Sequence, residues 1–390
     1  MNLIALLFCP FAFTTGAFVF SGVLQPMAAS LGVSVAAVAT LQSVFAIACA
    51  LCGPVLAHMT RRLPPRTLLL GVLLLLTILN AASALAGDFR TLFVLRLLVG
   101  GIGSLSFPLA TMLAVSGTTA EGRPKAISTV YAGIPMALIV GIPLGSVTGN
   151  AFGWQASFVA VAAICAIAVV LVAAFVREGA GPVPGAAQGA APRFGSAIFT
   201  HLGVTLIAST ALFSMVGLIG PIIRATTGFS GTGIAAVQFL AGLSSLVGVR
   251  LGSALVARDV RYGLVVPFAL LLVSLGIVVS PLVGGVVTVV TILAMIASVS
   301  LGPAAQSATG TLVQARLAEM AGSAARLAFS LNGSMIYLGQ GLGIVLGAAA
   351  FEQWGLGAAP ATGLILTLPG IALALHVARA LKNSPTQTEN

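Results

Sequence analysis

Arg96 is the residue whose chemistry contrasts most with its surroundings in this sequence. It stands in an apolar run, residues 92–103, about five residues inside the hydrophobic stretch 91–116. An arginine at the centre of a bilayer costs on the order of 3 kcal/mol by insertion scales, so it is rarely kept without a partner or a function. The alternative is that its long side chain snorkels to the membrane surface.

Carboxylates, by contrast, are missing from the middle of every apolar run. An intramembrane carboxylate is the simplest proton site and the simplest partner for a cationic ligand. Its absence argues against binding of a strong cation, and it leaves Arg96 and the nearby Asp88 as the candidate groups for any exchange of protons here. The seven acids are Asp88, Glu121, Glu178, Asp259, Glu319, Glu352 and Glu389.

Other reactive groups form no site. No G-x-x-x-x-G-K-[ST] phosphate loop and no nucleophile–base cluster can be assembled, so we expect a protein that is not an enzyme and needs no cofactor. The three histidines lie far apart near ends of apolar runs, which disfavours a metal site. The four cysteines, two of them in a C-x-x-C, lie inside apolar runs and suit packing. These residues are His58, His201, His376, Cys9, Cys49, Cys52 and Cys165.

The elements that must position these residues are membrane spans. The chain has 390 residues, 59% of them hydrophobic and 6% charged, against roughly a quarter charged in soluble domains. A span needs about 20 mostly apolar residues. We predict twelve spans: residues 3–27, 34–58, 67–87, 91–116, 126–149, 155–176, 197–222, 231–257, 263–283, 286–313, 325–350 and 357–380.

A segment of linker composition divides these spans into six and six. Residues 177–196 are rich in Gly, Ala and Pro and nearly lack large apolar side chains, which is typical of a flexible connection. We therefore predict an all-α membrane protein of two pseudo-symmetric six-helix bundles, residues 1–176 and 197–382, with a tail at residues 383–390.

The distribution of basic residues predicts the orientation. Basic residues cluster on the cytoplasmic side of membrane proteins. With both termini in the cytoplasm of an inner-membrane protein, thirteen of the 17 basic residues lie inside. The net charge of +10 is spread over these short segments, without a basic face, so nucleic acid is not an expected partner.

The two halves repeat one another. Such a duplication is typical of transporters built from two parallel halves. Three pairs of identical residues stand 196 positions apart: Gly32 and Gly228, Gln42 and Gln238, Arg62 and Arg258.

Three segments carry a family pattern. The first is the turn after the second span, where Gly53, Arg62 and Arg66 stand, with Arg258 and Asp259 as counterparts in the second half. Arginines there can pair with helix C-terminal carbonyls or lipid phosphates. Plain anchoring by positive charge explains them equally well.

The second segment, residues 92–103, reads L-x-x-x-R-x-x-x-G-x-x-G around Arg96. The third, residues 132–155, carries glycines four residues apart, a proline and a following F-G-W. Glycines at this spacing let a second helix approach closely, and a proline bends the helix. These features suit a gating interface between halves or any tight helix pair. The residues are Gly141, Pro143, Gly145 and Gly149.

Together, these segments resemble the major facilitator superfamily, and within it the twelve-span drug and sugar efflux branch of arabinose-efflux-permease-like proteins. The match is incomplete, because Arg61 stands where the family's turn has an acid and Gln155 where it has an arginine. The resemblance implies that Arg96 takes part in proton coupling. It also implies a central cavity lined by polar and aromatic residues: Thr14, Gln25, Ser104, Phe107, Tyr131, Ser214, Gln306, Asn332 and Tyr337.

From this resemblance we expect a monomeric secondary transporter in the lipid bilayer. It would export a small, neutral or amphipathic molecule such as a drug, sugar or metabolite in exchange for protons. An importer or facilitator on the same fold is the alternative, because the spans contain no carboxylate to bind a proton.

Overall fold

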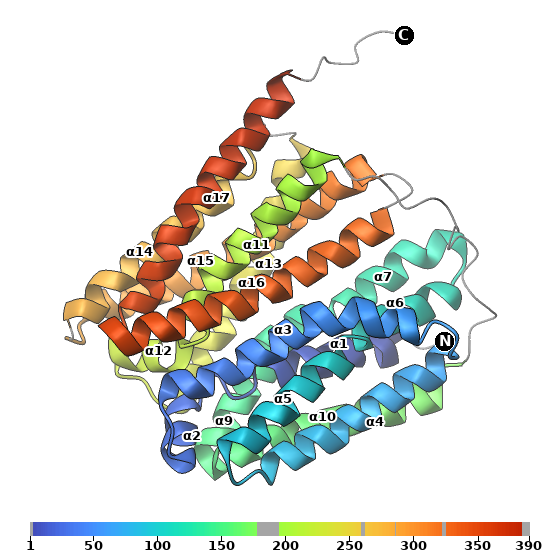
Figure 1. Ribbon diagram of the computed structural model, residues 1–390, viewed down its shortest axis with the longest axis horizontal. Coiled ribbons are helices and arrows are strands. Elements are labelled where there is room, and N and C mark those ends of the chain that lie inside the picture. The colour runs from blue at the N-terminus through green and yellow to red at the C-terminus, as the bar shows by residue number, and fades with distance from the viewer. Residues whose placement is uncertain (1–2, 178–194, 259–261, 285, 322–324, 384–390) are drawn as a thin grey trace.

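The computed structural model describes residues 3–177, 195–258, 262–284, 286–321 and 325–383, and every regular element in those ranges is helical. Eleven helical segments there are long and apolar enough to cross a membrane. A further apolar helix, α1 (Leu3–Phe18), is shorter. The predicted all-α fold of two bundles is confirmed (Figure 1).

The first half of the chain builds one bundle. Its helices after α1 are α2 (Leu24–Leu31), α3 (Val35–Met59), α4 (Pro65–Ala84), α5 (Phe89–Gly103), α6 (Ser106–Ser116), α7 (Arg123–Tyr131), α8 (Gly133–Met136), α9 (Ile142–Phe152) and α10 (Trp154–Phe175), with a 3₁₀ turn η1 (Ala120–Gly122) and a π-helical turn η2 (Ala137–Gly141).

The second half builds the other bundle. Its helices are α11 (Ser196–Val216), α12 (Ile219–Thr227), α13 (Thr232–Ala257), α14 (Val265–Gly284), α15 (Val289–Ala321), α16 (Ala325–Trp354) and α17 (Ala358–Asn383). Most of the predicted connection, residues 178–194, and part of the predicted tail lie outside the described residues.

The first span of each half is interrupted, which the hydropathy pattern did not predict. The expected single spans 3–27 and 197–222 are each two helices, α1 with α2 and α11 with α12. Both second pieces end at a glycine with positive φ, Gly32 at 65° and Gly228 at 72°. Glycine adopts this conformation without steric cost, which explains why the repeat retains it at both positions.

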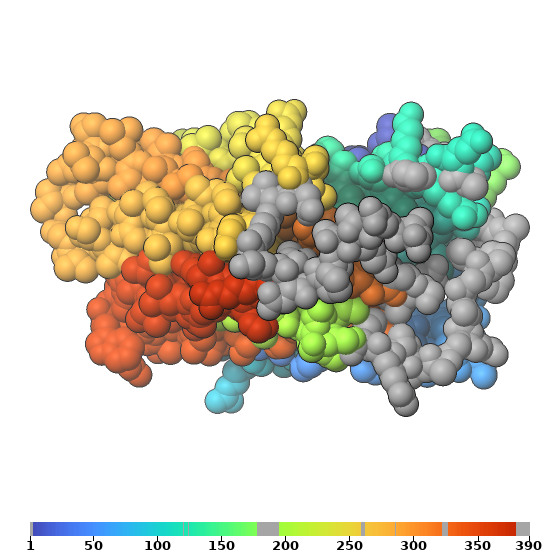
Figure 2. Space-filling model, turned by 90° about the horizontal axis from the view of Figure 1, so that it is seen from above, coloured from blue at the N-terminus to red at the C-terminus, as the bar shows by residue number. Residues whose placement is uncertain are grey.

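Each half has its own apolar core. One cluster of buried residues is drawn almost wholly from the first half and the other from the second. In Figure 2 the yellow to red second half occupies mainly one side of the molecule, and the teal part of the first half the other side. The ribbons diverge toward the end of the molecule that carries both termini, which we call the terminal end (Figure 1).

The glycine stripe of α9 packs inside the first half. A Cβ at Gly141 would lie beside the Thr15 side chain, and one at Gly145 would lie 2.4 Å from the Val19 carbonyl oxygen. These glycines therefore allow the close approach of α1 and of the turn that follows it. The stripe does not itself join the halves, and its role in gating stays a prediction.

The opposite face of the same span touches the second half. A Cβ on Gly242 of α13 would lie 2.7 Å from the Leu138 backbone in η2. The π-helical turn precedes Pro143, which lies in the first turn of α9 and has no N–H to continue the helical ladder. The proline thus shapes the backbone where the halves meet.

Gly145→Leu tests the close approach of α9 to the turn that follows α1. The added side chain meets the Val19 backbone, so we expect a loss of stability of at least about 1–3 kcal/mol, the usual cost of overpacking. Thermal unfolding of the purified protein in detergent measures it. Gly71→Leu on α4, where a Cβ meets nothing within 4 Å, is the matched control. Equal melting temperatures for the two variants would contradict this packing.

Candidate functional site

Arg96 lies in the interior of the first bundle. Its side chain is fully buried, so it does not snorkel to the surface. Its Nη2 donates a hydrogen bond of 2.8 Å to the carbonyl oxygen of Gly16. Gly16 belongs to the last turn of α1, whose carbonyls have no partner within the helix. Arg96 therefore caps α1 at the point where the first span breaks.

Three phenylalanine rings surround the guanidinium. Its Cζ lies 4.7 Å from the ring centroid of Phe45, 5.3 Å from that of Phe20 and 5.9 Å from that of Phe158. Cation–π contacts of desolvated groups contribute about 2 kcal/mol each. Together with the hydrogen bond, they are large enough to offset an insertion cost of about 3 kcal/mol. The charge is thus held by π faces and a backbone dipole.

Part of this site remains unsatisfied. Within the described part of the chain, Nε and Nη1 of Arg96 find no acceptor, and the buried Oδ1 of Asn80 finds no donor. An unpaired buried polar atom costs about 1–3 kcal/mol. The hydrogen bonds around Arg96 are therefore an incomplete set among the described residues.

Glycines on the same helix bring the rings close. A Cβ on Gly100, one turn after Arg96, would lie 2.3 Å from the Phe45 carbonyl oxygen, and one on Gly103 would lie 2.3 Å from the Phe13 ring. Because neither glycine has a side chain, α3 and α1 can approach α5 closely. The L-x-x-x-R-x-x-x-G-x-x-G pattern therefore positions both the cation and its surroundings.

Asp88 is not the counter-ion of Arg96. It caps the exposed start of α5, where its carboxylate accepts hydrogen bonds of 2.9 Å from the Thr91 amide and 2.6 Å from the Thr91 hydroxyl. These bonds lower the pKa of the Asp88 carboxyl. Its cap is therefore lost only as the pH falls through that lowered pKa. Eight residues of helix place it about 12 Å from Arg96 along the axis.

A buried glutamine joins the halves at the end opposite to the termini. Nε2 of Gln238 in α13 donates a hydrogen bond of 2.9 Å to Oγ of Ser21, in the break after α1. Oε1 of Gln238 accepts a hydrogen bond from Oγ of Ser146 in α9. All three side chains are buried. We call Ser21, Ser146 and Gln238 the latch.

The halves also meet along α3 and α16, and we call this contact the seam. Oγ of Ser43 donates a bond of 2.8 Å to the Gly341 carbonyl oxygen. A Cβ on Gly341 would lie 2.5 Å from the Ile47 side chain. Nearer the rim, Oγ of Ser34 donates a bond of 2.6 Å to Glu352. The buried residues of α3 end at Ala50, so the halves meet along only the first part of this helix.

Comparisons with known proteins agree with this architecture. A model of the Major Facilitator Superfamily matches residues 6–327. The chain belongs to the major facilitator superfamily. It is a multi-pass membrane protein and a transporter of small solutes.

Relatives in this superfamily cover nearly the whole chain. The inner membrane transport protein YdhP of Escherichia coli strain K12 is 28% identical over 98% of this chain and 97% of its own. A probable sugar efflux transporter of Mannheimia succiniciproducens is 24% identical over 94% and 90%. A chloramphenicol resistance protein of Streptomyces lividans is 30% identical over 70% and 71%.

The fold has a solved counterpart in the superfamily. A bacterial homolog of the human lysosomal transporter Spinster, in an inward-facing and unoccupied conformation, superposes with a TM-score of 0.79 over 99% of this chain and 98% of its own. Its sequence identity is 16%, so the likeness concerns the fold.

The basic turn of the superfamily pattern braces the first bundle. Nε of Arg66 donates to the Val176 carbonyl at 2.6 Å, and its Nη2 donates to the Ala173 carbonyl at 2.8 Å, at the end of α10. Arg62 is exposed, and Gly53 faces Ser104. In the second half, Arg258 follows α13 and is exposed, whereas Asp259 lies outside the described residues.

The structure separates the predicted cavity residues into small groups. Phe107 packs edge-on against Tyr131 with ring centroids 4.4 Å apart. Tyr337 of α16 packs against Phe13 of α1 in the other half, with ring centroids 6.5 Å apart. Gln306 donates to Ser209 at 2.8 Å, and its buried Oε1 has no donor among the described residues.

The remaining predicted cavity residues divide between packing and half-buried positions. Ser214 is fully buried and donates to the Ala211 carbonyl at 2.8 Å. Asn332 accepts a bond of 2.7 Å from Thr205 inside the second half. Thr14, Gln25 and Ser104 are half-buried, and the Ser104 hydroxyl donates to its own helix.

Sequence reasoning missed the partners in both clusters. Phe20, Phe45 and Phe158 look like ordinary core residues in apolar spans, and nothing in the pattern places them at Arg96. Gln238 did carry a signal, because it repeats Gln42 at the interval of 196. A repeated amide in a span indicates a conserved place in the fold, yet it does not reveal which helices the amide joins.

Arg96→Ala removes the cation and leaves three rings around a gap. We expect transport to be abolished while the protein still inserts, because removal of a buried charge lowers the cost of insertion. Uptake or efflux measured against the amount of membrane-inserted protein checks this. Arg90→Ala, at an exposed position in the first turn of α5, is the control. Wild-type transport in Arg96→Ala would remove Arg96 from the mechanism.

Gln238→Leu breaks the latch. It leaves the Ser21 and Ser146 hydroxyls without their amide partner, at about 1–3 kcal/mol for unpaired buried groups. A change of about 1.4 kcal/mol alters an equilibrium constant tenfold. The halves should therefore separate at the end opposite to the termini in a roughly ten- to a hundredfold larger fraction of molecules. Spin labels on cysteines at Ala29 and Ala225, exposed positions on α2 and α12, measure the distance across this end.

The label experiment uses a Cys52→Ala background, because the other three cysteines are buried. Gln314→Leu, at an exposed position on α15, serves as the matched amide-to-leucine control. A distance distribution in Gln238→Leu equal to that of the control would contradict the role of the latch.

Proposed function

We propose that this transporter is a secondary active exporter that moves a small, neutral or amphipathic molecule out of the cell by alternating access, in exchange for protons. The observation that carries the proposal is the pairing of a fully buried arginine at the break of the first span with a latch on the same break. A change at Arg96 acts directly on the backbone that holds Ser21.

The arrangement of the halves supports alternating access. The halves are bonded at the end opposite to the termini, through the latch and through Ser43 and Gly341. Toward the terminal end, α3 becomes exposed, with Leu51 at 62% and Met59 at 71%. Under the positive-inside bias, the terminal end faces the cytoplasm. The molecule then stands open inward, and the Spinster homolog was solved in an inward-facing conformation.

The nature of the solute follows from the groups between the halves. The side chains that we expect to face the solute carry amide, hydroxyl and aromatic groups, as Gln306, Tyr131 and Tyr337 do. Each of the four carboxylates in the described part of the chain lies at a helix end or in a connection, with Glu319 paired to Arg316 and Glu352 bonded to Ser34. These groups suit hydrogen bonding to a neutral molecule better than binding of a strong cation. We further propose that the transporter is a monomer with both termini in the cytoplasm.

The names of relatives favour export over import. One is called a sugar efflux transporter and another a chloramphenicol resistance protein. An importer or a facilitator remains the second candidate, because no described carboxylate near Arg96 is available to take up a proton.

A susceptibility and accumulation screen on an efflux-deficient host tests the proposal. Cells that express the wild type should accumulate at least one screened compound, chloramphenicol and small sugars among them, less than cells that express Arg96→Ala. Collapse of the proton gradient should abolish the difference. A difference that survives the collapse would contradict proton coupling, and greater accumulation with the wild type would indicate import.

A further inference from the structure

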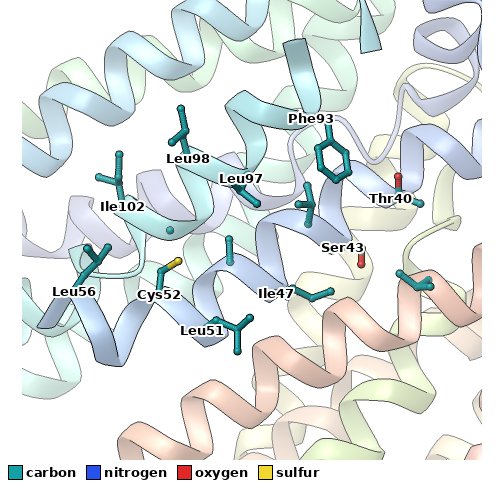
Figure 3. Close-up of a pocket in the computed structure, with 14 residues that line it drawn as sticks. Thr40, Ser43, Ile47, Leu51, Cys52, Leu56, Phe93, Leu97, Leu98 and Ile102 are labelled. Carbon is teal, nitrogen blue, oxygen red and sulfur yellow. The ribbon is translucent and has the colours of Figure 1, made fainter. Parts of the chain in front are cut away.

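A groove opens on the surface of α3 and α5, beside the contact between α3 and α16. Its volume is about 500 Å³, and it is lined by α3, α5 and one residue of α16 (Figure 3). Phe93, Leu97 and Leu98 of α5 form one wall, and Ile47 and Leu51 of α3 form the other. Leu51 is 62% exposed, so the groove is open to the surroundings of the protein.

The chemistry of the groove excludes water as its occupant. Apart from Thr40 and Ser43 at one end and Cys52 farther along, its side chains are aliphatic or aromatic. The two hydroxyls already donate to backbone carbonyls, of Ala37 and Gly341. A water molecule needs about two to four polar partners, and the groove offers almost none.

The lining also resembles the inside of the bilayer in composition. The groove follows α3 from Thr40 to Leu56, which is about 24 Å of helix at 1.5 Å per residue. Its exposed neighbours on α5 are apolar as well, with Val94 at 54%. An empty groove would forfeit dispersion contacts along its whole length, and the chains of the surrounding lipid are the apolar groups at hand.

We propose that the groove is a binding site for one acyl chain of a membrane phospholipid, and that this chain stabilises the state in which α3 and α16 meet. The site is continuous with the seam between the halves, because Ser43 and Ile47 line the groove and also contact Gly341 of α16. Val345 of α16 completes the lining from the second half. A bound chain therefore contacts both halves at once, and separation of α3 from α16 removes part of its site. This inference does not depend on the direction of transport.

Photolabelling tests the site on the full-length protein. The protein is reconstituted in vesicles of phosphatidylethanolamine and phosphatidylglycerol that contain a phosphatidylcholine with a diazirine in the middle of one acyl chain. After irradiation, labelled residues are mapped by mass spectrometry. We expect labelling per exposed residue to be several-fold higher at the groove positions of α3 and α5 than at exposed positions of α4, such as Leu74 and Ile78.

Gly101→Phe supplies the second measurement, because Gly101 lines the groove and a Cβ there lies in ordinary contact with Cys52, at 3.4 Å from its Sγ. The added ring should lower groove labelling several-fold, whereas Gly71→Phe on α4, in open space, should leave it unchanged. Labelling spread evenly over all exposed apolar positions of the wild type would overturn the proposal. So would cross-linking of two copies through Cys52 by a bifunctional maleimide in the same vesicles, since a second chain would then cover the groove.

Discussion

A positive charge without a carboxylate partner is the constraint on which the first bundle depends. The guanidinium of Arg96 can remain inside only because it makes cation–π contacts with three rings and a hydrogen bond to one backbone carbonyl. Those partners come from α1 and the turn that follows it, from α3 and from α10, so the charge ties together segments that are distant in sequence. The carbonyl is free because α1 ends early, and the early end is tolerated because Arg96 caps it.

This mutual dependence extends to the latch between the halves. The five residues after α1 form a turn, and Ser21 in that turn accepts the hydrogen bond from Gln238. A Cβ on Gly220 of α12 would lie 2.5 Å from the Ser21 carbonyl oxygen. The break in the first span therefore contacts both a charge buried in its own half and two helices of the other half. Only five positions separate Gly16, which bonds to Arg96 inside the first bundle, from Ser21, which bonds to the second half.

Hydropathy and charge predicted the fold class because they express what the bilayer requires. We can recognise apolar runs of sufficient length, a central linker and an interval of 196 residues without knowing which helices touch. The interrupted first spans could not be predicted in this way, since residues 19–23 are as apolar as a helix requires. The turn at residues 19–23 is stabilised by Arg96 and Gln238, which are tertiary partners. Likewise, the glycines of α9 indicated a close neighbour without indicating that the neighbour is α1.

The repeat also differs between the halves in an informative way. Gln42 stands in α3 where Gln238 stands in α13, and both are buried. Gln238 bonds to two serines of the other half, whereas Nε2 of Gln42 finds no acceptor in the described part of the chain. At the contact of α13 with the first half, Gln238 forms hydrogen bonds to two side chains. At the contact between α3 and α16, Ser43 donates to a backbone carbonyl and Ser34 donates to Glu352. The two junctions between the halves therefore differ in their polar contacts, although the repeat places a glutamine at the same position of each half.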